Sequence, residues 1–223
     1  MSIGFSIAPR APAIDPALLA AFAGVPTPIA SDNMSRMFSG GAGLRPYHDG
    51  TPLLGVALTV RTRPGDNLMV HKAIDLAEPG DVIVIDAGGD LTNAILGEIM
   101  TTLAAKKGIA GFVVDGAVRD TDSIAKAPFA VYALGVIHRG PYKDGPGEIN
   151  GLISIGGTPV RPGDIIIGDA DGVLAIPRDE APAIAKLCHA QMEREKAILA
   201  SIADGTVDRR WIDETLKAKG FKP

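Results

Sequence analysis

Residues 81–114 read DVIVIDAGGDLTNAILGEIMTTLAAKKGIAGFVV, and this stretch decides the fold. Its first part, Asp81 to Ile85, is a short run of β-branched residues that predicts a buried strand. Ala94 to Lys106 has the length and residue types of a helix, and Ile109 to Val114 predicts a second strand. Strands that alternate with helices in this way are typical of an α/β domain.

The same alternation extends toward the N-terminus. Leu54 to Thr62 predicts a strand, and Leu68 to Leu76 predicts a helix. Further upstream, Asp15 is suited to cap a short helix that begins with Pro16. We therefore expect a short helical arm before the α/β domain.

The second half of the chain predicts short strands with almost no helix between them. Gly and Pro turns separate these strands, so we expect extra β structure laid against the α/β core. The predicted strands are Ala130 to Gly135, Leu152 to Ile155, Asp164 to Gly168 and Gly172 to Ile176. One local device occurs twice, because Glu78 to Asp86 and Arg161 to Asp169 each place a Pro-Gly turn before an apolar strand that ends in a carboxylate.

The C-terminal region has a different pattern. Ala181 to Ile202 predicts one long helix, and a polar tail follows it. Apolar residues recur along this helix at helical spacing and predict one stripe, which contains Ile184, Leu187, Cys188, Met192, Leu199 and Ile202. The predicted organisation is thus an α/β domain at 1–180 and a helical extension at 181–223.

Composition limits the function classes. The 223 residues are 46% hydrophobic, which is enough for one substantial core. The net charge of -4 comes with no basic run, so we expect neither a nucleic-acid partner nor a membrane surface. No stretch resembles a signal peptide or a spanning helix. The single cysteine, Cys188, excludes an internal disulfide and predicts a packing role, which suits a reducing cytoplasm.

A glycine-rich corner could hold an anion. Gly88 and Gly89 follow the strand at Asp81 to Ile85, and Gly97 precedes Glu98 at a predicted helical segment. Backbone N–H groups are left free at such corners and at helix starts. The alternative is that Gly88 and Gly89 only make a turn.

A second corner follows the next strand and carries Arg119 and Asp120. Arginine suits a carboxylate because its guanidinium donates two parallel hydrogen bonds. Aspartate is a hard oxygen ligand for Mg²⁺ or Mn²⁺, and magnesium commonly takes only one or two protein carboxylates. The alternative is a solvated surface ion pair, the commoner fate of adjacent Arg and Asp.

The spacing of these residues resembles a family signature. Twenty residues lie between Glu98 and Arg119, and Asp120 follows directly. This pattern resembles the acidic-x20-Arg-Asp signature of the RraA-like superfamily, which includes class II 4-hydroxy-4-methyl-2-oxoglutarate and 4-carboxy-4-hydroxy-2-oxoadipate aldolases. The resemblance covers roughly Pro26 to Glu195 and includes the segments Pro64 to Met69, Gly111 to Asp120, Gly156 to Asp164 and Asp169 to Val173.

The resemblance implies a fold and a set of site residues. The fold is a layered α/β/β sandwich of the swivelling-domain type with a C-terminal helical extension. In the aldolases of the family, the acidic residue at position 98 orients a water. The backbone at Gly97 to Met100, which includes Ile99, holds the pyruvyl group together with Arg119, and Asp120 organises the metal. Many members have aspartate at position 98, so Glu98 is a departure in length.

The resemblance also implies a function. It predicts a lyase in which Mg²⁺ or Mn²⁺ assists the cleavage of 4-hydroxy-2-oxo dicarboxylic acids to pyruvate, with oxaloacetate decarboxylase as a side activity. Asn67 is a candidate substrate contact, although an Asn after Gly-Asp also suits a helix cap. The alternative function is that of a non-enzymatic RraA-like regulator of ribonuclease activity.

The resemblance further implies a homotrimer or a dimer of trimers, in which a glutamate from the neighbouring subunit's C-terminal helix reaches the metal through water. Glu195 is the candidate because it falls on the apolar stripe. A salt bridge of Glu195 with Arg194 or Lys196 is the competing interpretation. His71, His138 and His189 lack metal-ligand spacing, so they predict packing or rim positions, with the loop at 138–141 bordering the substrate entrance.

Overall fold

The computed structural model describes residues 3–38 and 41–221. Its main sheet is ten-stranded, and a separate two-stranded hairpin packs nearby. The strands are β1 Phe5–Ile7, β2 Arg45–Pro46, β3 Leu53–Thr62, β4 Asp81–Asp86, β5 Ala94–Leu96, β6 Gly111–Val118, β7 Ala130–Val136, β8 Gly147–Ile149, β9 Ile153–Ile155, β10 Thr158–Val160, β11 Ile165–Asp169 and β12 Gly172–Ile176. The helices are α1 Pro16–Ala20, α2 Thr27–Asn33, α3 Leu68–Leu76, α4 Glu98–Lys106, α5 Thr121–Ile124, α6 Ala181–Ala203 and α7 Arg210–Ala218.

The centre of the main sheet is parallel. Strands β3, β4, β6 and β7 are neighbours in that order, and each pair runs in the same direction. On β4, Ile83 and Ile85 face one hydrophobic cluster, whereas Val82 and Val84 face another. All four are fully buried, because a parallel strand in this position is covered on both faces. Each contributes roughly 1.5–3 kcal/mol through burial.

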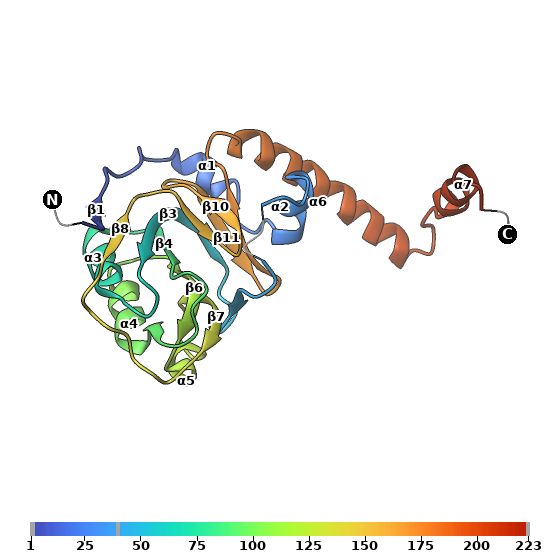
Figure 1. The fold of residues 1–223 in the computed structure, drawn as a ribbon. Coiled ribbons are helices and arrows are strands. Elements are labelled where there is room, and N and C mark those ends of the chain that lie inside the picture. Colours follow the sequence, from blue (N-terminus) through green and yellow to red (C-terminus); the bar gives the residue numbers. More distant parts are fainter. Residues whose placement is uncertain (1–2, 39–40, 222–223) are drawn as a thin grey trace.

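Different layers cover the two faces of this sheet. Helices α3 and α4 supply residues such as Ile74 and Met100 to one cluster. The hairpin β9–β10 and the strands β11 and β12 supply residues such as Ile153 and Ile166 to the other. Figure 1 shows α3, α4 and α5 grouped on one side of the strands, with β10 and β11 on the other. The α/β fold expected from the sequence is confirmed.

The long C-terminal helix α6 is only partly packed. Near its start, Ile184 and Cys188 are buried, and the helix packs on α1 and α2. Burial raises the pKa of the Cys188 thiol, in keeping with a packing role. Farther along, Leu199 is 66% exposed and Ile202 is 55% exposed. Figure 1 shows this half projecting away from the sheet and leading to α7. The predicted apolar stripe is therefore buried at Ile184 and Cys188, whereas Leu187 in the same half is 49% exposed.

The helix predicted over Ala94 to Lys106 is observed from Glu98 onward, and the prediction was wrong only over residues 94–97. The helix begins only at Glu98, because Ala94–Leu96 forms the strand β5 and pairs in parallel with β6. Two backbone hydrogen bonds hold β5, since Ala94 N–H donates to Arg139 O at 2.8 Å and Arg119 N–H donates to Leu96 O at 3.0 Å. Long-range pairing thus overrides local helical spacing. Strand β6 also runs four residues past its predicted end and stops beside Arg119.

None of the described helices is both long enough and apolar enough to cross a membrane.

Candidate functional site

The start of α4 is one wall of the candidate site. Gly97 is the N-cap residue and has no side chain of its own to cap the helix. The Glu98 amide donates to Oδ2 of Asp120 at 3.0 Å, and the Met100 amide donates to the Gly97 carbonyl at 3.1 Å. The Ile99 amide has no acceptor among the described residues. Free amides at a helix start, together with the positive end of the helix dipole, favour an anion.

Asp120 stands in an unusual backbone conformation opposite this helix start. Its φ of 58° and ψ of 37° are left-handed, which is rare outside glycine and costs a non-glycine residue roughly 1 kcal/mol. The conformation directs the carboxylate at the α4 start, where the Glu98 amide holds Oδ2. A Cβ at position 97 would overlap that oxygen, so only glycine fits. The close approach of Gly97 and Asp120 is thus built into the site.

Arg119 follows directly after β6 and precedes Asp120. Its Nε lies 3.6 Å from Asp120 Oδ2, and both side chains are 40% exposed. A Cβ at Gly140 would contact a terminal guanidinium nitrogen of Arg119, so this glycine leaves room for the arginine. The guanidinium is therefore packed against backbone and remains open to a ligand.

A single pocket brings these groups together with a buried amide side chain. Asn67 is 2% exposed, and its Nδ2 donates to the Ile95 carbonyl at 2.8 Å. Its Oδ1 has no hydrogen-bond partner among the described residues, a state that buried polar atoms rarely adopt. The pocket is lined by Asn67, His71, Ile95, Leu96, Gly97, Ile99, Met100, Arg119, Asp120, Pro141 and Lys143. Asn67 thus offers a buried acceptor at this pocket.

Two basic side chains line the pocket besides Arg119. Lys143 lies in the segment between β7 and β8, and His71 lies on α3. Burial lowers the pKa of His71, and the positive charge of Lys143 lowers it further, whereas Asp75 opposes the shift. The lining thus contains Arg119, Lys143 and His71 but only one carboxylate, that of Asp120. This charge balance suits an anionic ligand.

The structure places most of the predicted site residues at this pocket. Gly97, Ile99, Met100, Arg119, Asp120 and Asn67 all line it. The Glu98 amide lies at its edge, but the Glu98 side chain is exposed and is not part of the lining. Of the two interpretations of Gly88 and Gly89, the structure favours the turn, because both have positive φ and their amides already donate to Asp86 Oδ1 and to the Asp115 carbonyl.

Glu195 lies outside this pocket. It occupies the exposed second half of α6, where its Oε1 accepts a hydrogen bond of 2.8 Å from Gln191. The described lining of the pocket comes from residues 67–143 of this one chain. The predicted salt bridges of Glu195 with Arg194 or Lys196 are not found among the described ion pairs. Its expected role across a subunit interface remains a prediction.

The sequence pattern does not predict two of the lining residues. Histidine spacing predicts a packing or rim position for His71, and no pattern distinguishes Lys143. On α3, His71 is four residues after Asn67, so one helical turn places both near the same surface. This spacing is a signal that could have identified His71. Of the 138–141 loop, Pro141 lines the pocket whereas His138 is exposed.

The residues present are compatible with one divalent cation. Asp120 has one oxygen engaged by an amide and the other without a described partner, and the buried Oδ1 of Asn67 belongs to the same pocket. The described part of the chain contains no group of three or more His, Cys, Asp or Glu side chains that could hold a metal. One carboxylate and one amide oxygen are hard donors, so this set fits magnesium or manganese that keeps most of its water ligands.

Comparison with known proteins identifies the family of this chain. The family model described as "RraA-like: Aldolase/RraA" matches residues 27–175. The chain belongs to the RraA-like family. All lining residues of the pocket lie within the matched segment.

RraA-like relatives with related sequences carry aldolase names. A Halalkalibacterium halodurans protein, provisionally named a 4-hydroxy-4-methyl-2-oxoglutarate aldolase, is 40% identical over 83% of this chain and 89% of its own length. A Thermus thermophilus protein named 4-hydroxy-4-methyl-2-oxoglutarate aldolase is 38% identical over 50% of this chain and 68% of its own. These names associate RraA-like sequences of this kind with a lyase.

Solved structures of RraA-like and similar proteins share the fold. An uncharacterised Pseudomonas syringae protein superposes with a TM-score of 0.79 at 25% identity, over 87% of this chain and 96% of its own. The RNA-processing inhibitor RraA from Thermus thermophilus has a TM-score of 0.62 at 31% identity, over 68% of this chain and 92% of its own. Relatives and structural neighbours of this chain are thus named both as enzymes and as an inhibitor. The fold does not decide between these two functions, so the function is inferred from the site.

Proposed function

We propose that this chain is a divalent-metal-dependent class II aldolase, a lyase that releases pyruvate from 4-hydroxy-2-oxo dicarboxylic acids. The observation that carries the proposal is the convergence of the α4 start, Arg119, Asp120 and Asn67 on one pocket. The aldolase names of its relatives support it. We further propose oxaloacetate decarboxylation as a side activity, because both reactions leave negative charge on a pyruvyl fragment.

The pocket has separate groups for the two ends of a pyruvyl unit. The carboxylate fits the start of α4, where the Ile99 amide has no acceptor among the described residues. Arg119 would then donate to the 2-oxo oxygen, where negative charge develops as the C–C bond breaks. Fixed donors of this kind contribute about 10²- to 10³-fold in rate. The amides and Arg119 thereby hold the reacting atoms in a fixed orientation.

The chemical balance of the cleavage is simple. The 4-hydroxyl group loses its proton, the C3–C4 bond breaks, and its electron pair stays on the pyruvyl fragment. That fragment takes up a proton at C3 and leaves as pyruvate, while the other fragment leaves as a carbonyl compound. Glu98, exposed beside the start of α4, is the proposed group that orients a water for these proton transfers.

The proposed cation is Mg²⁺ or Mn²⁺, with Asp120 as its protein ligand. When bound, a divalent cation supplies Lewis-acid stabilisation of negative charge on oxygen. Asp120 suits this position because the Glu98 amide fixes Oδ2 and leaves Oδ1 for a ligand or its water shell. We also propose a trimer or dimer of trimers in which Glu195 of a neighbouring subunit completes the site.

The test is a pyruvate-release assay on a panel of 4-hydroxy-2-oxo dicarboxylic acids and oxaloacetate. Purified protein with Mg²⁺ or Mn²⁺ is expected to release pyruvate, and EDTA is expected to abolish the reaction until the metal is restored. The structural likeness to an RNA-processing inhibitor favours a second candidate, a non-enzymatic regulator of ribonuclease activity. A metal-replete sample that is inactive on the whole panel and inhibits a ribonuclease would support that candidate.

A further inference from the structure

The turn Pro64-Gly65-Asp66 belongs to a set of three. The other two are Pro79-Gly80-Asp81 and Pro162-Gly163-Asp164. In each turn the glycine has a positive φ, of 72°, 88° and 88° respectively. Each aspartate amide donates to the carbonyl three residues earlier, at 3.0 to 3.1 Å, and each aspartate is at most 3% exposed. The three turns therefore share one backbone geometry and differ in what the carboxylate binds.

In two of the turns the carboxylate closes its own turn. Oδ2 of Asp81 accepts the Glu78 amide at 2.8 Å, and Oδ2 of Asp164 accepts the Arg161 amide at 2.8 Å. In each case the donor is the residue directly before the proline of the same turn. These carboxylates stabilise the starts of β4 and β11 and lie outside the lining of the candidate site.

Asp66 uses its carboxylate differently. Its Oδ2 accepts the amides of Asp144 at 2.8 Å and Gly145 at 2.9 Å, nearly eighty residues away along the chain. The residue directly before its proline, Arg63, donates its amide to the Pro146 carbonyl instead. The Arg63 guanidinium lies 3.1 Å from Asp66 Oδ2, so the buried charge is compensated.

The same turn also binds the other end of the 142–146 segment. Tyr142 N–H donates to the Gly65 carbonyl at 2.8 Å, and its own carbonyl accepts from Asn67 N–H at 3.0 Å. Residues on both sides of Lys143 are therefore fixed, and Lys143 itself lines the candidate site. The turn is continuous with Asn67, which lines the same pocket.

We propose that Asp66 is a positioning residue that holds Lys143 at the pocket. A buried carboxylate that accepts two adjacent amides fixes the backbone more firmly than a neutral acceptor, because hydrogen bonds to a charged group are shorter and stronger. Lys143 would otherwise sit on a segment without a strand or helix between β7 and β8. The backbone on both sides of Lys143 would then lose the contacts that keep this residue in the pocket lining with His71 and Arg119. The kinetic consequence of this inference rests on the proposed function.

The structural test compares the same substitution in two equivalent turns. Asp66→Asn keeps the side-chain volume but removes the charge, and it is expected to raise amide hydrogen exchange at Asp144 and Gly145 by about tenfold or more. Asp164→Asn is the matched control and should leave exchange at 141–147 unchanged. Arg63→Met is a milder variant, since its side chain is 45% exposed, and should give a smaller rise. Unchanged protection at Asp144 and Gly145 in both Asp66→Asn and Arg63→Met overturns the proposal.

The kinetic test is a double-mutant cycle on pyruvate release. If Asp66 acts through Lys143, then Asp66→Asn should add less than about twofold to the loss in kcat/KM already caused by Lys143→Met. Fully additive losses would show that Asp66 acts by another route. A wild-type protein that releases no pyruvate would reject the proposed function, and the exchange experiment would then decide the role of Asp66 alone.

Discussion

Gly97 and Asp120 are packed so closely that a Cβ on residue 97 would overlap Oδ2 of the aspartate. The contact joins the start of α4 to the left-handed residue after β6. It fixes the distance between the proposed anion-binding amides and the proposed metal ligand. This relationship gives the most direct test of the site.

Gly97→Ala should displace the Asp120 carboxylate from the Glu98 amide. We expect kcat/KM for pyruvate release to fall about 100-fold, because small misplacements of reacting groups have effects of that order. The fold should persist, since α4 is anchored by Met100 and Ala104 in the core. Gly151→Ala is the control, because a Cβ there meets only an ordinary contact with Glu148, and it should keep full activity. Equal activities of the two variants would remove the steric argument.

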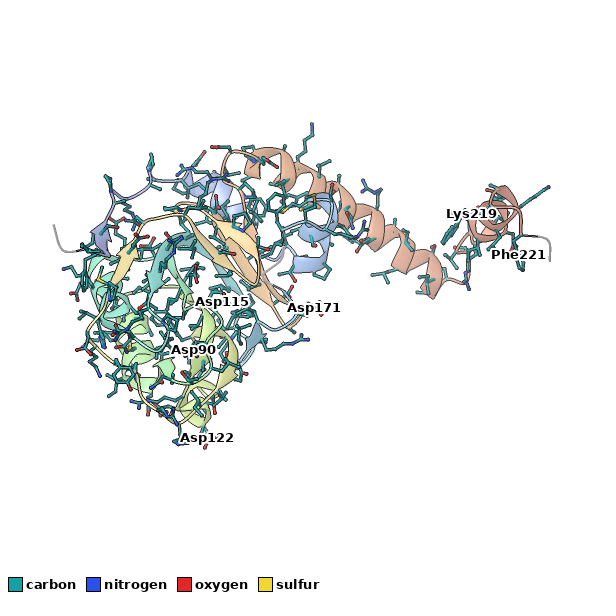
Figure 2. The ribbon with its side chains drawn as sticks, in the orientation of Figure 1. Asp90, Asp115, Asp122, Asp171, Lys219 and Phe221 are labelled. Carbon is teal, nitrogen blue, oxygen red and sulfur yellow. The ribbon has the colours of Figure 1, made fainter. Side chains whose placement is uncertain are left out.

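Asp120→Ala should lose metal affinity while remaining folded. We expect the Kd for Mn²⁺, measured by isothermal titration, to rise at least about tenfold, because the proposed protein ligand is gone. Asp122→Ala is the matched control, since Asp122 is exposed and lies outside the pocket lining. Figure 2 shows Asp122 at the outer edge of the molecule, by α5. An unchanged Mn²⁺ affinity in Asp120→Ala would exclude Asp120 as the ligand.

Mixing two inactive variants tests whether neighbouring subunits share the site. Asp120→Ala and Glu195→Gln are each expected to be inactive alone. If one site combines Asp120 of one subunit with Glu195 of the next, random mixed oligomers should regain about one quarter of the wild-type activity. Glu193→Gln, two residues away on α6, should be active by itself. Full activity of Glu195→Gln alone would argue that Glu195 has no part in the site.

The pKa of His71 should respond to the neighbouring lysine. Burial and the charge of Lys143 lower this pKa, so Lys143→Met should raise it toward the ordinary value of 6.5. NMR titration of the imidazole measures the shift, and Lys126→Met is the control, because Lys126 is exposed and lies outside the pocket lining. Because the folded pKa lies below the unfolded one, His71 costs stability as the pH falls through 6.5. Lys143→Met should lessen the loss of stability at low pH. An unchanged His71 pKa in this variant would show that the Lys143 charge does not act on the imidazole.

Asp115 should destabilise the fold when it is ionised. It pairs in register with Asp86 on the adjacent strand, and burial together with the Asp86 charge raises its pKa. Since the folded pKa lies above the unfolded one, the cost is present at neutral pH and is relieved as the pH falls through the raised pKa. Asp115→Asn should therefore increase the Tm at pH 7, with a gain that shrinks in acid. Figure 2 shows Asp115 among the strands and Asp122 at the outer edge of the molecule. Asp122→Asn is the control and should not change the Tm, because Asp122 is exposed. A lower Tm for Asp115→Asn at pH 7 would contradict this account.

The strands of the central sheet could be predicted from the sequence because each is a local run of buried β-branched residues. The predicted and observed ends of β4 and β12 agree within one residue. Ala94 to Leu96 could not be assigned in this way, since its conformation depends on pairing with β6. Local spacing carries no information about such a partner.

The same distinction applies to the site. Arg119 and Asp120 could be selected because they adjoin one another after a predicted strand and match a family spacing. Lys143 could not, because its neighbours are held by residues far along the chain: Asp66 and Gly65 accept the amides of Asp144 and Tyr142, and the Asn67 amide donates to the Tyr142 carbonyl. His71 could have been predicted from the sequence, since it follows Asn67 by one helical turn. Residues placed by distant backbone contacts are the ones that pattern analysis misses.

The described walls of the pocket come from residues 67–143, whereas α6 and α7 belong to 181–223. Under the proposed function, Glu195 is the one residue of α6 on which the chemistry depends. Substitutions elsewhere in the C-terminal segment can therefore accumulate without changing any lining residue of the pocket. One inherited pocket can then serve proteins whose outer surfaces have diverged, as long as the position of that single glutamate is kept.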